Sequence, residues 1–162
     1  MATAHRVGAT TFTTPTDREI VMTRVFDAPR RLVWEAWTSP EHLPHWMLGP
    51  PGWTMPICEM DLRPGGASRF VWRKSDGEEM EIRGVNQEVA PPERLVATSS
   101  WGGDWPETLN TMVLTEVDGK TTMTHTILYP SKEARDAALQ TGMKEGMSAS
   151  NDRLAEHLRS MA

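Results

Sequence analysis

Three polar side chains in the second half of the chain have the types and spacing that acid–base chemistry needs. In the stretch KTTMTHTILY, apolar residues and threonines alternate, so His125 and Tyr129 share a strand face with Met123 and Ile127. If that face is concave, an imidazole and a phenol enter an apolar space, and Asn110 could serve as a further orienting donor. His125 could then act as a general acid or base. The alternative is a histidine with a satisfied structural hydrogen bond, or one on the outer face, so no catalytic residue is assigned.

A second set of residues has the spacing of metal ligands. His42 and His45 form an H-x-x-H pair in a stretch that predicts a short helix. Pro44 lies between them and no third ligand is close in the sequence, whereas metal sites need three or four ligands in a set geometry. We therefore interpret both histidines as structural or solvent-exposed, and we expect no bound metal.

Cys58 is the single cysteine of the chain. One thiol excludes an intrachain disulfide framework and a cysteine-based metal site. A nucleophilic role would need a nearby base to form the thiolate, and the sequence identifies none. We expect a buried thiol in a strand whose apolar pattern changes phase near Pro56.

The motif DLRPGG, residues 61–66, separates two strand-like runs. Proline fixes its own φ and the two glycines tolerate positive φ, so the motif predicts a tight turn and the two runs predict a hairpin. Asp61 and Arg63 could form an ion pair around the turn, which Arg69 could join from across the hairpin. We expect these charges to orient the hairpin rather than to catalyse a reaction.

The elements that must position these residues follow from the apolar pattern. Residues 1–17 are small, polar and rich in threonine, and they predict a flexible N-terminal arm. Residues 18–26 predict a first strand, and residues 29–37 predict a helix with proline at its start. A second, short helix begins near Pro40 and is interrupted by Pro44.

Residues 53–129 predict a run of strands joined by Pro-Gly and Asp-Gly turns, which is typical of one long antiparallel meander. Residues 131–161 carry apolar side chains at every third or fourth position, so they predict a long amphipathic helix. Gly142 and Gly146 lie one turn apart on its buried side. They indicate either a close approach of the sheet or space left for another molecule.

This order of elements predicts an α+β fold in which a strongly curved antiparallel sheet of about six or seven strands wraps around a long C-terminal helix. A long sheet with one apolar face needs a cover, and the C-terminal helix is large enough to provide it. Two short helices follow the first strand. We expect residues 18–162 to form a single domain.

Charge and hydrophobicity exclude several classes of function. The chain has 17 Lys and Arg residues against 22 Asp and Glu residues and a net charge of -5, which argues against nucleic-acid binding. No window resembles a signal peptide or a membrane span, so we expect a cytoplasmic protein without membrane insertion. Seven Trp and 11 Met residues suit an interior that adapts to another shape.

Four stretches resemble a known family: VFDAPRRLVWEAWTSPEHLPHWM at 25–47, DLRPGG at 61–66, PPERLV at 91–96, and the two Gly-Met pairs at 142–147. In this order they resemble the START-like or SRPBCC superfamily, with the helix-grip fold of the birch-pollen allergen Bet v 1. The branch they resemble is named after the C-terminal domain of the activator of the heat-shock protein 90 ATPase. The resemblance covers about residues 19–160 and implies a central pocket for a hydrophobic or amphipathic small molecule.

The pocket interpretation assigns a wall of large apolar residues and a few polar groups. The alternative is that the apolar residues form an ordinary core. The predicted ligand-binding residues are Trp37, Trp46, Phe70, Trp72, Met80, Trp101, Asn110, Met112, His125, Tyr129, Met143 and Met147.

Three hypotheses for function remain. The first is a module that binds a hydrophobic small molecule in the cavity, without a cofactor. The second is a cofactor-free acid–base enzyme, of the cyclase, dehydratase or lyase type, that uses the same cavity. The third is a protein-interaction domain in a stress or chaperone setting, although the resemblance does not by itself imply chaperone activation.

The Pro- and Gly-rich segment HLPHWMLGPPGW, residues 42–53, distinguishes these hypotheses. In an interaction domain, the clustered apolar side chains of this segment would be exposed as a surface patch. A binding protein would use it as a lid over the mouth of the pocket, and we favour the lid. The sequence leaves the ligand's identity and the formation of a homodimer open.

Overall fold

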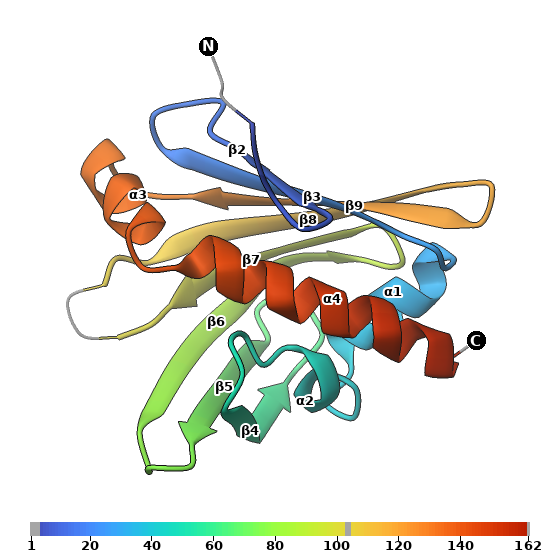
Figure 1. The fold of residues 1–162 in the computed structure, drawn as a ribbon, viewed down its shortest axis with the longest axis horizontal. Coiled ribbons are helices and arrows are strands. Elements are labelled where there is room, and N and C mark those ends of the chain that lie inside the picture. The colour runs from blue at the N-terminus through green and yellow to red at the C-terminus, as the bar shows by residue number, and fades with distance from the viewer. Residues whose placement is uncertain (1–3, 103–104, 162) are drawn as a thin grey trace.

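The computed structural model describes residues 4–102 and 105–161, which form nine strands and four helices (Figure 1). The strands are β1 (His5–Val7), β2 (Thr10–Thr13), β3 (Glu19–Phe26), β4 (Trp53–Met60), β5 (Ala67–Lys74), β6 (Glu79–Ala90), β7 (Arg94–Ser100), β8 (Thr108–Val117) and β9 (Lys120–Leu128). The helices are α1 (Arg30–Thr38), α2 (Leu43–Trp46), α3 (Lys132–Leu139) and α4 (Met143–Met161).

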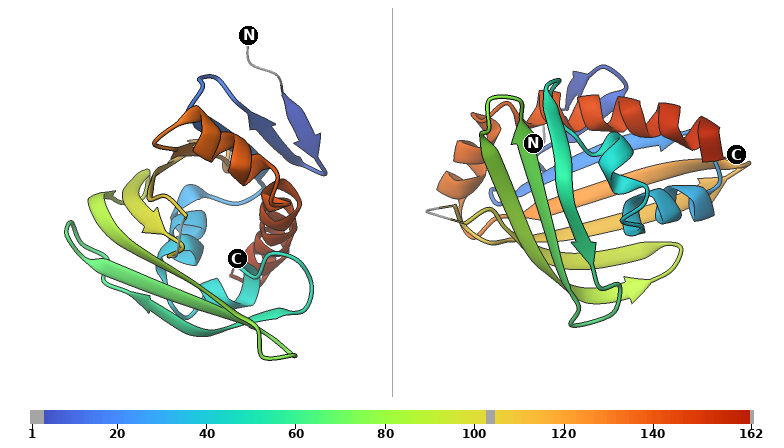
Figure 2. Two further views of the ribbon diagram at one scale, coloured as in Figure 1. Left: turned by 90° about the vertical axis from the view of Figure 1, so that its left-hand side faces the viewer. Right: turned by 90° about the horizontal axis from the view of Figure 1, so that it is seen from below.

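All nine strands belong to one antiparallel sheet with the order β1-β2-β3-β9-β8-β7-β6-β5-β4. The sheet curls strongly, and α4 crosses its concave side with α1 and α2 beside it (Figure 2). This is the predicted helix-grip fold of the α+β class. None of the helices within the described residues is both long and apolar enough to cross a membrane.

The most tightly packed part of the core lies where β3, β8 and β9 meet α1 and α4. On β3 and β9, alternate side chains point inward, so Ile20, Met22 and Met123 are almost fully buried. Val33 of α1 and Leu154 of α4 close the same cluster. Residues far apart in the sequence are therefore fixed together on one side of the concave space.

The strand count differs from the predicted six or seven because residues 5–13, predicted as part of a flexible arm, form β1 and β2. Strand β2 pairs with β3, and Phe12 is 2% exposed. Helix α4 holds this hairpin by three hydrogen bonds: Ser148 Oγ donates to Val7 O at 2.7 Å, Asn151 Nδ2 donates to Thr10 Oγ1 at 3.3 Å, and Lys144 Nζ donates to His5 Nδ1 at 2.8 Å. The small polar residues of this hairpin thus contact α4. Their low hydrophobicity gave no indication of this contact in the sequence.

The C-terminal segment is two helices rather than the predicted continuous helix. Ser131 Oγ accepts a hydrogen bond from Ala134 N–H and caps α3, which ends at Leu139. Gly142 has φ +78°, a left-handed conformation that glycine adopts readily, and α4 begins immediately after it. Gly146 does lie inside α4, with an added Cβ placed 3.5 Å from Pro50.

The DLRPGG motif forms the predicted turn between β4 and β5. Asp61 and Arg63 form the predicted ion pair at 2.8 Å, but Arg69 pairs with Glu81 and Glu59 instead. The turn is also clamped to β6 by Asn86. The backbone N–H of Asn86 donates to Gly66 O, its carbonyl accepts from Gly65 N–H, and its side-chain amide donates to Asp61 O.

Candidate functional site

The concave face of β8 and β9 carries the polar residues predicted for the site. Asn110 and Met112 on β8 lie opposite Ile127 and His125 on β9. The alternation on β9 directs His125 to the same face as the buried Met123. The sequence therefore predicted the face of this histidine correctly.

His125 is 9% exposed and is held by one side chain. Asn110 Nδ2 donates to Thr108 Oγ1 at 3.0 Å, so Asn110 Oδ1 is the atom that faces His125 Nε2 at 3.0 Å and accepts a hydrogen bond from its N–H. Burial lowers the pKa of His125 to about 4, so the ring is neutral at pH 7. Its Nδ1 then carries a lone pair, and this buried atom has no hydrogen-bond partner among the described residues.

Trp37 of α1 lies against the same histidine. The Trp37 ring meets the His125 ring edge to face, with centroids 5.9 Å apart, and it meets Trp46 in the same way at 4.9 Å. Trp46 is almost fully buried and donates its Nε1–H to Ala36 O. The Nε1–H of Trp37 is also buried but finds no acceptor in the described part of the chain.

Tyr129 lies just past the end of β9, four residues beyond His125, which is a distance of about 13 Å along an extended chain. Burial raises the pKa of Tyr129 to about 12, and its hydroxyl donates to Met143 Sδ at 3.9 Å. The structure therefore brings Asn110 to His125 but directs the tyrosine hydroxyl to α4. The two titratable groups do not converge on one reacting atom.

The other half of the concave wall comes from β5, β6 and the end of β7. Trp72 donates its Nε1–H to Met47 O at 2.7 Å and stacks on Trp101 with ring centroids 5.5 Å apart. Met80 lies opposite Trp72 in the sheet register, and Phe70 is 6.2 Å from Trp72 between ring centroids. Trp72 and Phe70 are half-buried, whereas Met80 and Trp101 are each 42% exposed.

Helix α4 packs on α1, α2, β1 and β2, away from this aromatic half of the wall. Its Met143 and Met147 are half-buried beside the core, while Met112 of β8 is 4% exposed. The predicted site residues thus divide into two groups. Trp46 and Met112 belong to the packed core, and the aromatic residues of β5–β7 remain partly accessible on the concave side.

The segment that joins α2 to β4 is attached to α4. Gly49 N–H donates to Ser150 Oγ at 2.8 Å, and Arg153 donates to Gly49 O at 2.6 Å. Pro50 lies beside Gly146, where an added Cβ would make ordinary van der Waals contact with Pro50 at 3.5 Å. This attachment, together with the hydrogen bond from Trp72 to Met47, ties the segment to both α4 and β5.

Cys58 points to the same face as Phe70, its partner in the register of β4 and β5. It is half-buried rather than fully buried, and desolvation raises its pKa to about 11. The thiol is therefore protonated at pH 7 and is a poor nucleophile. A register shift between Thr54 and Ile57 accounts for the change of phase that the sequence shows near Pro56.

His157 of α4 is a neighbour that the sequence analysis missed. It approaches His42, with His42 Nδ1 2.9 Å from His157 Nε2, and its ring stacks on that of His45 at 5.3 Å. Desolvation and the two other histidines lower the pKa of His157. No group of three or more His, Cys, Asp or Glu side chains within residues 4–102 and 105–161 is arranged to hold a metal ion.

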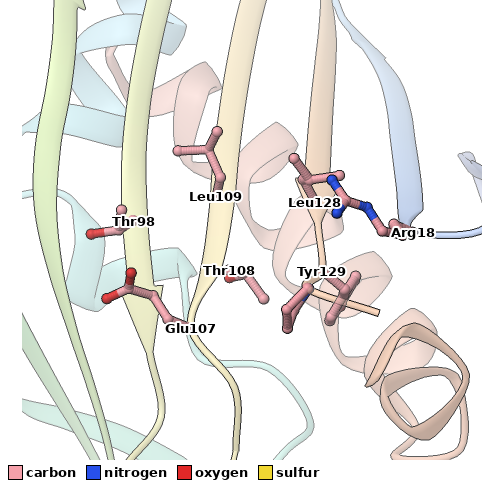
Figure 3. Close-up of a pocket in the computed structure, with 8 residues that line it drawn as sticks. Arg18, Thr98, Glu107, Thr108, Leu109, Leu128 and Tyr129 are labelled. Atoms are coloured by element: carbon pink, nitrogen blue, oxygen red, sulfur yellow. The ribbon is translucent and has the colours of Figure 1, made fainter. Parts of the chain in front are cut away.

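Two open hollows lie outside this wall. The first has a volume of about 180 Å³ at the ends of β7, β8 and β9, where Thr98, Leu109 and Leu128 face away from the concave side (Figure 3). The second has a volume of about 420 Å³ and lies across β4–β7, with Arg69 and Arg83 in its lining. Of the predicted site residues, Tyr129 lines the first hollow.

Comparison with known proteins places the chain in a family. The family model described as "Activator of Hsp90 ATPase homolog 1-like protein" matches residues 27–159, which is most of the chain. A search of the curated proteins found no match.

Solved structures share the fold over nearly the whole chain. A protein from Rhodobacter sphaeroides is 29% identical, covers 94% of this chain and 99% of its own, and superposes with a TM-score of 0.88. A protein from Nitrosomonas europaea is 25% identical over 91% of this chain and 98% of its own, with a TM-score of 0.81. A Mycobacterium smegmatis protein is 24% identical over 98% of this chain and 96% of its own, with a TM-score of 0.78.

Proposed function

The chain belongs to the family of activator of Hsp90 ATPase homolog 1-like proteins, within the SRPBCC superfamily, and on that premise we propose that it binds a small molecule. The ligand is hydrophobic or amphipathic and lies between the concave face of β5–β9 and helix α4. The lining consists of the predicted residues that lie outside the packed core, with Trp37, Phe70, Trp72 and Trp101 as its aromatic part.

The observation that carries this proposal is the partial exposure of large apolar side chains that point inward. Phe70 and Trp72 face the concave side yet are only half-buried, and Trp101 stacks on Trp72 while 42% exposed. Each Å² of apolar surface removed from water contributes roughly 25 cal/mol, so covering these rings with an apolar ligand is favourable. Sites for small molecules are typically concave and mostly apolar.

The chemistry of the wall supports binding over catalysis. An acid–base enzyme needs at least two convergent groups whose pKa values suit proton transfer. His125 is a weak base with a pKa of about 4, the pKa of Tyr129 is about 12, and the tyrosine hydroxyl contacts Met143 instead of the histidine. Cys58 is protonated. The proposed function therefore includes no reaction.

The burial of apolar side chains in residues 42–53 favours a lid over a docking patch for a chaperone. Leu43 and Trp46 are almost fully buried, and Met47 and Leu48 pack against the core. An apolar patch for a partner protein would instead expose these side chains.

Native mass spectrometry of freshly purified protein tests the proposal, combined with thermal unfolding in the presence of fatty acids, sterols and polyketides. Ala97 faces the concave side opposite Asn110, whereas its neighbour Thr98 faces the outer side opposite Leu109. We expect Ala97→Phe to fill the space and weaken binding by at least about tenfold, or roughly 1.4 kcal/mol. The matched variant Thr98→Phe should bind normally.

Loss of extra mass on denaturation, or stabilisation by a compound that Ala97→Phe abolishes, supports the proposal. If no small molecule is released and none of the panel raises the unfolding temperature, binding in this space is contradicted. The protein-interaction hypothesis would then take its place.

A further inference from the structure

Two buried polar atoms without partners lie on adjacent rings of the concave wall. Trp37 Nε1 and His125 Nδ1 make no hydrogen bond within residues 4–102 and 105–161, although Trp37 and His125 are in edge-to-face contact at 5.9 Å. A buried polar group left unpaired loses its hydrogen bonds to water without replacement, so folded proteins leave few of them. Two such atoms on rings that contact each other indicate a place where another molecule completes the hydrogen bonding.

The two atoms have opposite requirements. The indole Nε1–H of Trp37 can only donate a hydrogen bond. His125 Nε2–H donates a hydrogen bond to Asn110 Oδ1, so in the neutral ring Nδ1 can only accept. The group that satisfies both must accept from one ring and donate to the other, and a hydroxyl group does both.

The charge around the pair distinguishes a hydroxyl from a carboxylate. Ionised carboxylate oxygens only accept hydrogen bonds, so a carboxylate could not donate one to His125 Nδ1. Arg24 on β3 also faces inward and has an unpartnered Nε, but its charge is already matched by Asp152 at 2.7 Å. The site therefore offers no unmatched positive charge at Arg24.

We propose that the ligand is a neutral alcohol or phenol whose hydroxyl group accepts from Trp37 Nε1–H and donates to His125 Nδ1. This rests on the proposed binding function and narrows it. The aromatic half of the wall, around Trp72, covers the apolar body of the ligand. Trp37 and His125 determine its specificity.

Three compounds with one apolar skeleton test the proposal: naphthalene, 2-naphthol and 2-naphthoate. At pH 7 we expect 2-naphthol to bind about tenfold more tightly than naphthalene, because two buried groups become paired. The carboxylate should bind less tightly than 2-naphthol. Ligand-detected and protein-detected NMR titrations measure the three affinities.

Variants of the two rings separate hydrogen bonding from shape. Trp37→Phe and His125→Phe keep an aromatic ring at each position, and we expect both to reduce the preference for 2-naphthol over naphthalene to about twofold or less. Trp105→Phe, at an exposed tryptophan outside the site, should retain the full preference.

The Trp37 indole N–H signal of the wild-type protein gives a further measurement, in which no core residue is substituted. The indole N–H signal that disappears in Trp37→Phe should move on addition of 2-naphthol and stay in place with naphthalene. Equal affinities for naphthalene and 2-naphthol, or tightest binding of 2-naphthoate, would overturn the hydroxyl assignment. Absence of binding by all three would also overturn it, while the mass-spectrometric experiment on its own still decides the proposed function.

Discussion

His125 illustrates how burial changes the role of a residue. In water a histidine is half protonated near pH 6.5, and it suits proton transfer. On the concave wall its pKa falls to about 4, and Asn110 fixes which nitrogen keeps the proton. The same side chain is thereby converted from an acid–base candidate into a neutral acceptor at pH 7.

This burial also predicts a pH dependence of stability. Between about pH 6.5 and pH 4 the unfolded chain protonates His125 but the folded protein does not, so the unfolded state binds more protons and stability falls as the pH is lowered. We expect His125→Gln to remove a slope of roughly 1.4 kcal/mol per pH unit from the free energy of unfolding in this range.

Urea unfolding at several pH values, for wild type and variant, measures the difference between the two slopes. His5→Gln, at an exposed histidine of β1, serves as the control and should follow the wild type. Parallel curves for wild type and His125→Gln would contradict the assignment of a buried neutral ring.

What the sequence predicted at this scale depended on local periodicity. Alternation along β9 correctly placed His125 on the same face as Met123, while the sequence left open whether that face is concave. The unpaired Trp37 Nε1–H and the contact of His157 with His42 depend on how separate elements meet in space. No local pattern could therefore reveal them.

At the scale of elements, the turn between β4 and β5 shows why the DLRPGG motif needs its second glycine. A Cβ on Gly66 would lie 2.0 Å from Asp61 O, which is impossible without moving the backbone. The first glycine, Gly65, has φ +81° but open space around it. The two glycines therefore serve different purposes: one permits the turn, and the other permits close approach to Asp61.

We expect Gly66→Ala to destabilise the protein by about 3 kcal/mol or more, because the hydrogen bonds to Asn86 must shift with the backbone. The matched variant Gly65→Ala should cost roughly 1–2 kcal/mol, the ordinary penalty for a side chain at positive φ. Denaturant unfolding of both variants measures the difference. Equal losses would show that the clamp by Asn86 tolerates displacement.

The sequence predicted this hairpin, because proline and glycine act within a few residues. It did not predict the break between α3 and α4. Apolar spacing continues across the break, so the periodic signal was the same on both sides of Gly142. The helix is interrupted at Gly142 by its left-handed backbone conformation, which the spacing of apolar residues does not reveal.

At the scale of the whole molecule, the order of elements was enough to predict a curved sheet around a C-terminal helix, and the similar solved structures share that fold. The β1–β2 hairpin was missed because its few apolar residues give no clear alternation. Yet it extends the sheet beyond β3 and supplies partners to α4 through Val7 and Thr10.

Removal of residues 1–15 should therefore have two effects. The free energy of unfolding should fall by about 3 kcal/mol or more, because the burial of Phe12 and the hydrogen bonds of Ser148 and Asn151 are lost. The edge of β3 would also be exposed, and an exposed edge strand pairs readily with another chain.

Denaturant unfolding and light scattering after size-exclusion chromatography measure these two effects. Removal of residues 1–4, which precede β1, is the control and should leave both properties unchanged. A shortened chain that keeps the oligomeric state and the stability of the full chain would show that the hairpin adds nothing to the sheet.

The stacked pair Trp72 and Trp101 has an optical consequence. Two indoles 5.5 Å apart and nearly parallel couple their excited states, which produces a paired positive and negative band in the far-ultraviolet circular dichroism spectrum. Trp72 is also bonded to Met47, at the start of the segment that joins α2 to β4. Displacement of that segment by an entering molecule would change the angle between the rings. The circular dichroism of this tryptophan pair would therefore report ligand entry without an added label.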